Sequence, residues 1–566
     1  MGKRPLRRKS RESQNFIKLS EPPLGDSLPI IPRLEVLCAI VLTSVIVFLH
    51  VYRASEAGAL WRDEIATISA ATKPSLSQLW SSLPYESFPI FPYLLLRMCM
   101  ASHWLGGTDL SLRVMGALIG LGIVSVFWLN RRVLGYNVPL FSLALFGFNH
   151  IVIPWGDSIR GYGLGTILIL LTYGLVWKAV QFPSPGNIAR AAFVAILSVQ
   201  SLYQNAFILL AICLGAVLVC IRKRLWKRAF VVISIGAAAA LSLIPCLPLI
   251  KRTQELLIVA ESSYSWLQLL RIFAFSLSSN VQFLLWAWII CCGICVLAVA
   301  HLIGFKRRDR DDENRVDMSI FSLTILGVGT AFILLFLKVA DLPTSPWYYI
   351  VVMGPIALSV DVGIEQLAST SRRRALRLVA VLVLAGVTLP LTWAIIRQRN
   401  TSIDIIASTL AKRAAVADFI VVNPYWFGIT FQRYYEGNAK WITIPPIKDL
   451  TLNRYDLLKE RMSTADPLQP VFEGIEKSLR SGNRVWVIGV LRLPPEGQLP
   501  KVLPPAPSGP QGWEMGPYVD SWQEQLGYFL NSHLLEVEDV PLQITDRIKI
   551  NPGLEAPFVQ VGKGWR

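Results

Sequence analysis

Two adjacent carboxylates, Asp63 and Glu64, are the residues of this sequence best suited to acid–base chemistry. They follow the first long apolar run and stand in the segment Leu60-Trp61-Arg62-Asp63-Glu64-Ile65-Ala66. A carboxylate at the edge of a bilayer is partly desolvated, which moves its pKa towards the range useful for a general base. The alternative is an ordinary helix start, since Asp and Glu favour the first turn of a helix. Asp63 and Glu64 are therefore candidate catalytic residues, and Arg62 is a candidate substrate-binding residue.

A second polar cluster follows a later apolar run, in Trp155-Gly156-Asp157-Ser158-Ile159-Arg160-Gly161-Tyr162. Arg160 carries a planar fork of N–H donors that suits a phosphate group, and Asp157 adds a third carboxylate. The alternative is a local Asp157–Arg160 ion pair that anchors a loop. Tyr348 and Tyr349 begin another apolar run on the same predicted face. They are candidate substrate-binding residues, although rings at that depth also form ordinary aromatic belts.

The composition places these residues in a membrane protein. Of 566 residues, 53% are hydrophobic and only 16% are charged, against a usual charged share of about 25%. The mean hydropathy is +0.47. The net charge of +17 comes from 55 Lys and Arg against 38 Asp and Glu. Because the basic residues form short clusters between apolar runs, they indicate membrane orientation, and a nucleic-acid partner is not needed to explain them.

Runs of roughly 17–25 apolar residues predict about eleven transmembrane helices. The region 190–221 is divided into two spans around Tyr203-Gln204-Asn205, because a single span would put later basic clusters on opposite sides of the membrane. The predicted cytoplasmic clusters are Arg131-Arg132, Arg222 to Arg228, Lys306 to Arg308 and Arg372 to Arg377. The predicted spans are 34–51, 111–129, 138–155, 163–180, 190–203, 205–221, 229–250, 281–304, 319–338, 348–367 and 375–396.

The predicted fold is a multi-pass α-helical membrane protein with a small C-terminal extracytoplasmic α/β domain. It comprises a basic cytoplasmic segment (1–33), a transmembrane domain (34–396) with a first external loop at about 52–110, and the C-terminal domain (397–566). Within the loop, the proline-interrupted stretch 76–106 contains Arg97 and suits a helix along the membrane interface. The C-terminal domain should contain strands at 419–422 and 484–488, and helices near 403–415, 453–462 and 470–481.

Several common chemistries have no signature here. The sequence contains no GxxxxGK[ST] phosphate loop, no glycine-rich dinucleotide turn and no GxSxG nucleophile motif. Its five histidines are scattered, and its eight cysteines lie in or beside apolar runs. We therefore predict no metal-binding residues.

The segments already described resemble the integral-membrane glycosyltransferases of the GT-C superfamily. The likeness is greatest to protein O-mannosyltransferases, lipid A aminoarabinose transferases and their bacterial relatives. It follows Trp61 to Glu64, Glu86 to Arg97, Leu112 to Leu118, Arg131 to Gly135 and Ser158 to Gly163, so motifs occur only in the first 165 residues. Many relatives have a His before a proline pair, where this chain has Ser87-Phe88-Pro89-Ile90.

The resemblance implies transfer of a sugar from a polyprenyl-phosphate donor to a lipid, glycan or protein acceptor at the outer face of the cell membrane. It implies that Asp63 is the catalytic carboxylate with Glu64 beside it, and that Asp157 is a supporting acid. Arg160 and Tyr162 would belong to the donor-phosphate region. The sugar, the acceptor and any need for a divalent metal stay open. Alternatives are a polysaccharide polymerase or ligase, a transporter or flippase of lipid-linked sugars, and an inactive scaffold.

Overall fold

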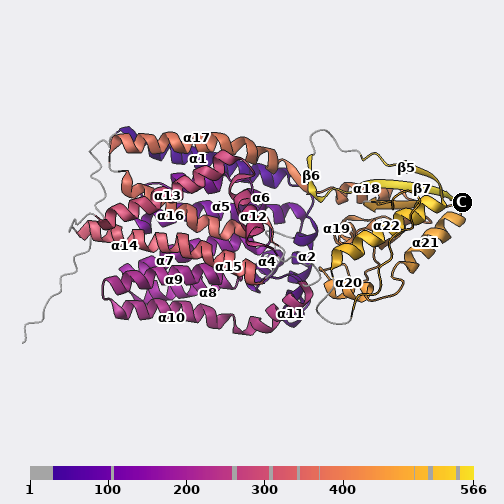
Figure 1. The fold of residues 1–566 in the computed structure, drawn as a ribbon, viewed down its shortest axis with the longest axis horizontal. Helices are drawn as coiled ribbons and strands as arrows, with labels where there is room; N and C mark the ends of the chain where they lie inside the picture. The colour runs from indigo at the N-terminus through magenta and orange to yellow at the C-terminus, as the bar shows by residue number, and fades with distance from the viewer. Residues whose placement is uncertain are drawn as a thin grey trace, which may run out of the picture.

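The protein consists of a helical bundle (30–396) and a C-terminal domain (397–566) placed end to end (Figure 1). These parts are seen in a computed structural model. It describes residues 30–102, 107–257, 264–304, 310–340, 344–368, 370–489, 491–507, 514–542 and 549–566.

Among these residues, nine helices are long and apolar enough to cross a membrane, by length and composition. They confirm the predicted multi-pass helical fold. The nine are α1 (Ile30–Glu56), α5 (Asp109–Leu134), α7 (Gly161–Gln181), α9 (Asn205–Arg222), α10 (Trp226–Ser242) continued by α11 (Leu247–Leu257), α13 (Gln282–Gly304), α14 (Arg310–Thr324) continued by α15 (Thr330–Ala340), α16 (Ile350–Leu367) with the turn η5 (Pro346–Tyr349) before it, and α17 (Ser371–Ile396).

The other two predicted spans are shorter helices. The span predicted at 190–203 is α8 (Pro185–Val199), which begins at a proline and is separate from α9, as the division at Tyr203 predicted. The prediction of one helix over 138–155 is wrong, because the segment contains a π-helical turn η2 (Ser142–Gly147) and a short α6 (Val152–Gly156). Between them the Asn149 side chain accepts from the backbone N–H of Ile151 (2.8 Å), which ends the regular helix.

The broken segment obtains hydrogen-bond partners from α16. The carboxylate of Asp361 accepts from the backbone N–H groups of Phe141 and Ser142, both at 2.8 Å. Backbone groups inside a membrane protein have no water to replace a missing helical bond, so an internal acceptor must satisfy them. Asp361 therefore stabilises the irregular chain that leads to Arg160.

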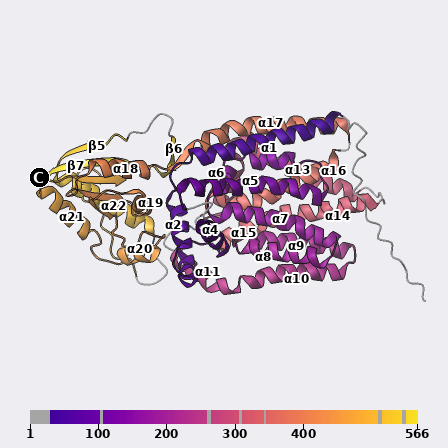
Figure 2. The same ribbon diagram turned by 180° about the vertical axis from the view of Figure 1, so that it is seen from behind.

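Figure 2 shows the start of α1, the start of α17 and α14 at the end of the bundle away from the C-terminal domain. Charged residues join the helices there. Glu35 near the start of α1 accepts from Arg374 and Arg377 of α17, both at 2.9 Å. Arg222 at the end of α9 pairs with Asp317 of α14. Residues of two predicted cytoplasmic clusters therefore form ion pairs with neighbouring helices, whereas Lys306 to Arg308 lie outside the described residues.

The first loop forms four short helices. Figure 1 shows the first of them at the end of the bundle nearest the C-terminal domain. Arg97 donates to the carbonyl oxygens of Ala71 (3.3 Å), Lys73 (2.6 Å) and Pro74 (3.2 Å), at and just after the end of helix α2 (Arg62–Ala71). The predicted helix around Arg97 is α4. The four helices are α2 (Arg62–Ala71), α3 (Leu76–Ser82), η1 (Leu83–Tyr85) and α4 (Phe91–Ala101), and α12 (Trp266–Ser278) follows later in the chain.

The C-terminal domain contains a five-stranded mixed sheet in the order β3-β2-β4-β7-β5. Strands β3, β2 and β4 are parallel, and β7 is antiparallel to both β4 and β5. The two predicted strands are confirmed as β2 (Phe419–Asn423) and β4 (Val485–Gly489), and the three predicted helices as α18 (Ile403–Arg413), α20 (Tyr455–Met462) and α21 (Gln469–Arg480). Not predicted were α19 (Phe427–Tyr434), α22 (Met515–His533), β1 (Gln398–Thr401), β3 (Lys440–Thr443), β5 (Leu534–Asp539), β6 (Lys549–Glu555) and β7 (Val559–Trp565).

Alternate residues of the central strands face opposite sides of this sheet, as the period of two requires. Ile420 and Ile488 are buried with Phe431 and other side chains of α18 and α19. Val421 and Val487 point to the other side of the sheet, where they belong to a different hydrophobic cluster that includes apolar residues of α20, α21 and α22. Helices therefore cover both faces, which gives the predicted α/β domain.

Polar contacts connect the bundle to this domain. Arg53 near the end of α1 donates to the carbonyl oxygen of Ile396 and to the side chain of Asn400, both at 3.2 Å. Tyr434 of α19 pairs with Asp109 at the start of α5 and accepts from the backbone N–H of Leu60 (2.8 Å). The segment between α1 and α2 is consequently bound to the C-terminal domain.

We expect Asp361→Ala to destabilise the bundle, because two buried N–H donors would lose their acceptor at about 1–3 kcal/mol each. Asp361→Asn keeps one acceptor oxygen and should cost less. Thermal unfolding of the purified protein in detergent measures both variants. Equal melting temperatures for wild type and Asp361→Ala would contradict the role of this carboxylate.

Candidate active site

Helix α2 begins at the candidate catalytic carboxylates because its first turn is anchored on both sides. Trp61, only 2% exposed, packs edge-on against Trp155 with 5.4 Å between ring centres. The carboxylate of Glu64 turns back and accepts from the backbone N–H of Trp61 (3.4 Å), as in a capping box. The neighbouring Asp63 projects from the same turn with its side chain 22% exposed.

Glu64 is directed into the protein. It forms an ion pair with Arg113 of α5 (2.9 Å) and is 1% exposed. Arg113 also donates to the carbonyl oxygens of Gly58 (3.2 Å) and Ala59 (2.7 Å). Both functions of the Glu64 carboxylate, the cap and the ion pair, hold the loop before α2 against the bundle.

Arg160 lies beside Asp63, at the residue before α7. Its Nη1 donates to the backbone oxygen of Asp63 (3.0 Å) and lies 3.5 Å from Asp63 Oδ2. The same nitrogen is 3.7 Å from Oε2 of Glu86, and the Arg160 side chain is 8% exposed. The two predicted clusters therefore meet through Arg160 and Asp63, although 97 residues separate them.

Asp157 faces the other way. Its Oδ1 is 2.7 Å from Nδ1 of His50 in α1, and its backbone lies against α5. A Cβ at Gly116 would be 1.8 Å from the carbonyl oxygen of Asp157, so only glycine allows this approach. The predicted alternative, a local Asp157–Arg160 pair, is replaced by two separate pairs: Asp157 fixes the turn to α1 and α5, and Arg160 reaches Asp63.

Glu86, at the end of η1, was not identified as a functional residue from the sequence. Its side chain is fully buried. Oε2 accepts from the hydroxyl groups of Thr67 (3.0 Å) and Tyr93 (3.5 Å), and Oε1 has no hydrogen-bond partner. Burial raises the pKa of Glu86 to about 7, although the Arg160 charge and these hydrogen bonds lower it. The sequence feature that could have identified Glu86 is its position as a single carboxylate among prolines and aromatic residues.

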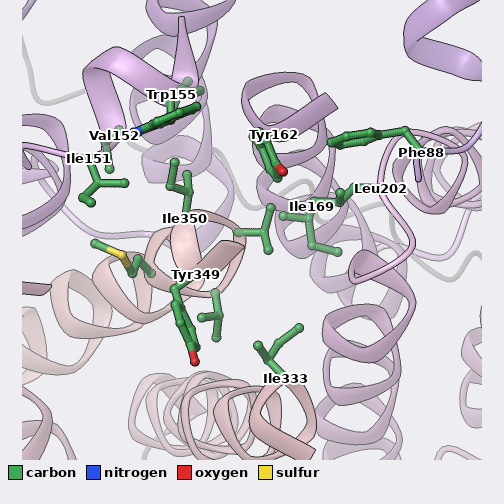
Figure 3. Close-up of a cluster of buried hydrophobic side chains, with 14 of the residues drawn as sticks. Phe88, Ile151, Val152, Trp155, Tyr162, Ile169, Leu202, Ile333, Tyr349 and Ile350 are labelled. Atoms are coloured by element: carbon green, nitrogen blue, oxygen red, sulfur yellow. The ribbon is translucent and has the colours of Figure 1, made fainter. Parts of the chain in front are cut away.

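Aromatic rings form the floor of the site. The Arg160 guanidinium lies over the Phe88 ring, 4.8 Å from its centre, and Phe88 meets Tyr162 edge-on at 5.1 Å. Tyr162 stacks with Tyr348 at 5.8 Å. Figure 3 shows Phe88 and Tyr162 beside each other, with Tyr349 lower down among aliphatic side chains. Tyr162 and Tyr348 therefore pack against each other in the candidate site, whereas the Tyr349 hydroxyl donates to the Leu269 carbonyl oxygen (3.0 Å).

The C-terminal domain contributes the opposite wall. The Arg62 guanidinium lies between the rings of Trp61 (5.7 Å) and Trp426 (5.8 Å), and Arg62 Nε is 3.4 Å from Asp63 Oδ1. Trp426 precedes α19 of the C-terminal domain. Arg62, a predicted substrate-binding residue, therefore links Asp63 to a domain that sequence analysis left without a role.

A second buried carboxylate approaches Arg62 from this domain. Glu555, 2% exposed, ends β6 and accepts from the Thr430 hydroxyl at 2.9 Å. Burial raises the pKa of Glu555 to about 7, while the charge of Arg62 opposes the increase. No motif in the sequence distinguishes Glu555.

Two cavities in the C-terminal domain lie apart from these residues. One, of about 590 Å³, is lined by residues such as Gly489 and Gln560, and the other, of about 430 Å³, by residues such as Trp441 and Arg461. Neither is lined by Asp63, Arg160 or Glu86. Within the described part of the chain, no group of three or more His, Cys, Asp or Glu side chains is arranged to hold a metal ion.

The arrangement combines a partly exposed carboxylate with a buried, charged guanidinium. A carboxylate in this position can remove a proton from a hydroxyl group. A preorganised guanidinium can stabilise negative charge on a phosphate, and it does so more strongly where water is excluded.

Comparison with known proteins gives a distant likeness to solved structures. No protein-family model matches the sequence, and no curated protein sequence matches it. Among solved structures, the chain is similar to the crystal structure of ArnT from Cupriavidus metallidurans bound to undecaprenyl phosphate. The two chains are 12% identical, the match covers 80% of this chain and 93% of that chain, and the TM-score is 0.46. ArnT is a lipid A aminoarabinose transferase of the GT-C fold, the group that the sequence motifs resemble. At this distance no residue role is transferred from it.

We expect the two adjacent carboxylates to differ sharply in their effect on stability. Glu64→Ala leaves Arg113 buried without its ionic partner, a change that typically costs about 3–5 kcal/mol. Asp63→Ala removes a partly exposed carboxylate and leaves Arg160 paired with Glu86, so a cost of about 1 kcal/mol or less is expected. Thermal unfolding in detergent compares the variants, and equal losses would contradict the structural role of Glu64.

Proposed function

We propose that this protein is a membrane glycosyltransferase that moves a sugar from a polyprenyl-phosphate donor to an acceptor hydroxyl at the outer face of the cell membrane. The observation that carries the proposal is the Asp63–Arg160 pair. It places a partly exposed carboxylate beside a buried guanidinium. A base and a phosphate-binding group are the roles that these two side chains are suited to.

In the proposed reaction, the acceptor oxygen attacks the anomeric carbon of the donor sugar, and the bond from that carbon to the phosphate oxygen breaks. Asp63 removes the acceptor proton during the attack, because a hydroxyl group is a poor nucleophile until it loses that proton. The electron pair of the broken bond stays on the phosphate, where Arg160 stabilises the added charge. The products are a glycosylated acceptor, polyprenyl phosphate and one proton.

The remaining predicted residues have positioning or binding roles in this proposal. Glu64 fixes the start of α2, and Asp157 fixes the turn that carries Arg160. Tyr162 and Tyr348 lie where a sugar or phosphate beside Arg160 would contact their rings. Arg62 carries positive charge next to Asp63 and would attract the anionic donor.

A second class of function, transport of lipid-linked sugars, needs no base at Asp63. Activity measurements separate the two. We expect Asp63→Asn to keep the protein folded and able to bind a polyprenyl-phosphate sugar, but to lower transfer about 10²–10⁴-fold. The assay follows a radiolabelled sugar from its lipid-linked donor into an envelope fraction, with purified protein in liposomes.

Matched controls are Asp63→Glu, which keeps a carboxylate, and Asp404→Asn, which changes an aspartate of the C-terminal domain that pairs with Arg399. Transfer at the wild-type rate by Asp63→Asn would remove the proposed base.

The proposal requires the Asp63–Arg160 end of the bundle to face outwards. A reporter fused after Arg131 should therefore be cytoplasmic, and one fused after Arg397 should be external. Alkaline phosphatase is active only outside the cytoplasm and makes the comparison direct. A cytoplasmic position for the Arg397 fusion would place the site on the wrong side of the membrane.

A further inference from the structure

One nitrogen atom of Arg160 serves two carboxylates. Nη1 lies 3.5 Å from Oδ2 of Asp63 and 3.7 Å from Oε2 of Glu86. If both carboxylates are ionised, the three groups carry a net charge of about −1. A phosphate that binds at Arg160 then enters a cluster that is already negative, and like charges in a poorly solvated site are costly.

Glu86 is the carboxylate of the pair with less access to solvent. Its side chain is fully buried, whereas that of Asp63 is 22% exposed. One oxygen of Glu86, Oε2, accepts both hydrogen bonds, from the hydroxyl groups of Thr67 and Tyr93. Oε1 is buried without a partner and is the atom that could carry a proton.

The other charged or titratable groups around Glu86 come from four elements. Arg160 precedes α7 and Asp63 belongs to α2. Tyr93 belongs to α4 and Tyr455 belongs to α20. Burial raises the pKa of both Tyr93 and Tyr455 above the ordinary value of tyrosine, so these groups stay neutral near pH 7. Glu86 is therefore the buried group whose protonation can respond when charge is added at Arg160.

We infer that Glu86 is a proton-linked positioning residue: it takes up a proton from solvent when an anionic phosphate binds at Arg160. The inference rests on the proposed function, which places the donor phosphate there. Protonation of Oε1 removes one negative charge from the cluster. Arg160 then no longer pairs with an ionised Glu86, so it interacts more strongly with the phosphate. No bond other than the O–H bond is formed, and the proton comes from buffer.

The pKa of free Glu86, raised to about 7 by burial, sets the pH range of the effect. Below this pH, Glu86 is already protonated and binding takes up no proton. Above it, a proton must be bound together with the phosphate, so the affinity falls as pH rises. For one linked proton the affinity falls by up to about tenfold per pH unit.

Isothermal titration calorimetry tests the inference on the full-length protein in detergent. The probe is methyl farnesyl phosphate, a phosphate diester that carries one negative charge across the whole range and does not titrate itself. Titration in two buffers of different ionisation enthalpy gives the number of protons bound. We expect the wild type to take up a substantial fraction of one proton at about pH 8 and almost none at about pH 5.

Two substitutions identify the group. Glu86→Gln should bind the diester without proton uptake and with an affinity independent of pH, whereas Asp63→Asn should retain the uptake. Thr67→Val removes a hydrogen bond that lowers the pKa of Glu86, so the pH of half-maximal uptake should increase. A residue with only a structural role would weaken binding equally at every pH.

The outcomes separate this inference from the proposed function. Diester binding by the wild type without proton uptake overturns the inference and leaves the proposed donor site in place. Uptake that persists in Glu86→Gln and disappears in Asp63→Asn assigns the linkage to Asp63 and also overturns the inference. Failure of the wild type to bind the diester overturns both.

Discussion

The charge of Arg160 is the constraint on which the candidate site depends. A guanidinium that is 8% exposed must be paired with negative groups, and this chain supplies Asp63 and Glu86 from two separate parts of the first loop. Pairing fixes the start of α2 and the end of η1 against the turn before α7. The result is a partly exposed carboxylate held next to a cation that is largely shielded from water.

The bundle holds this turn in place through a break in its helical order. The chain over 138–155 is not one regular helix, because the π-helical turn η2 and the short helix α6 divide it. Asp361 accepts from the backbone N–H groups of Phe141 and Ser142 at the start of this segment, Asn149 accepts from the N–H of Ile151 between η2 and α6, and Asp157 attaches the turn before α7 to His50. Irregular backbone inside a membrane protein is tolerated where neighbouring helices replace its hydrogen bonds, and here it precedes the turn that carries Arg160.

Hydropathy and charge patterns predicted the long helices and the change to an α/β domain, because both depend on solvent preference along the chain. The same patterns led to the expectation that Asp63 and Arg160 share one membrane face. They did not identify Glu86 or Trp426, since these contacts depend on how the first loop and the C-terminal domain fold over the bundle. The prediction of one helix over 138–155 is wrong for a related reason. Apolar composition indicates that a segment is buried, but the interruption of the helix involves hydrogen bonds to the side chains of Asn149 and Asp361, which composition does not indicate.

We expect the phosphate of a lipid-linked donor to bind at Arg160, beside Asp63. An electron cryomicroscopy structure of the protein with added polyprenyl phosphate tests this most directly. Density for the phosphate should place an oxygen within about 3 Å of the Arg160 guanidinium, with the lipid chain leading from it into the bundle. A phosphate bound elsewhere, with Arg160 still held between Asp63 and Glu86, would contradict the account.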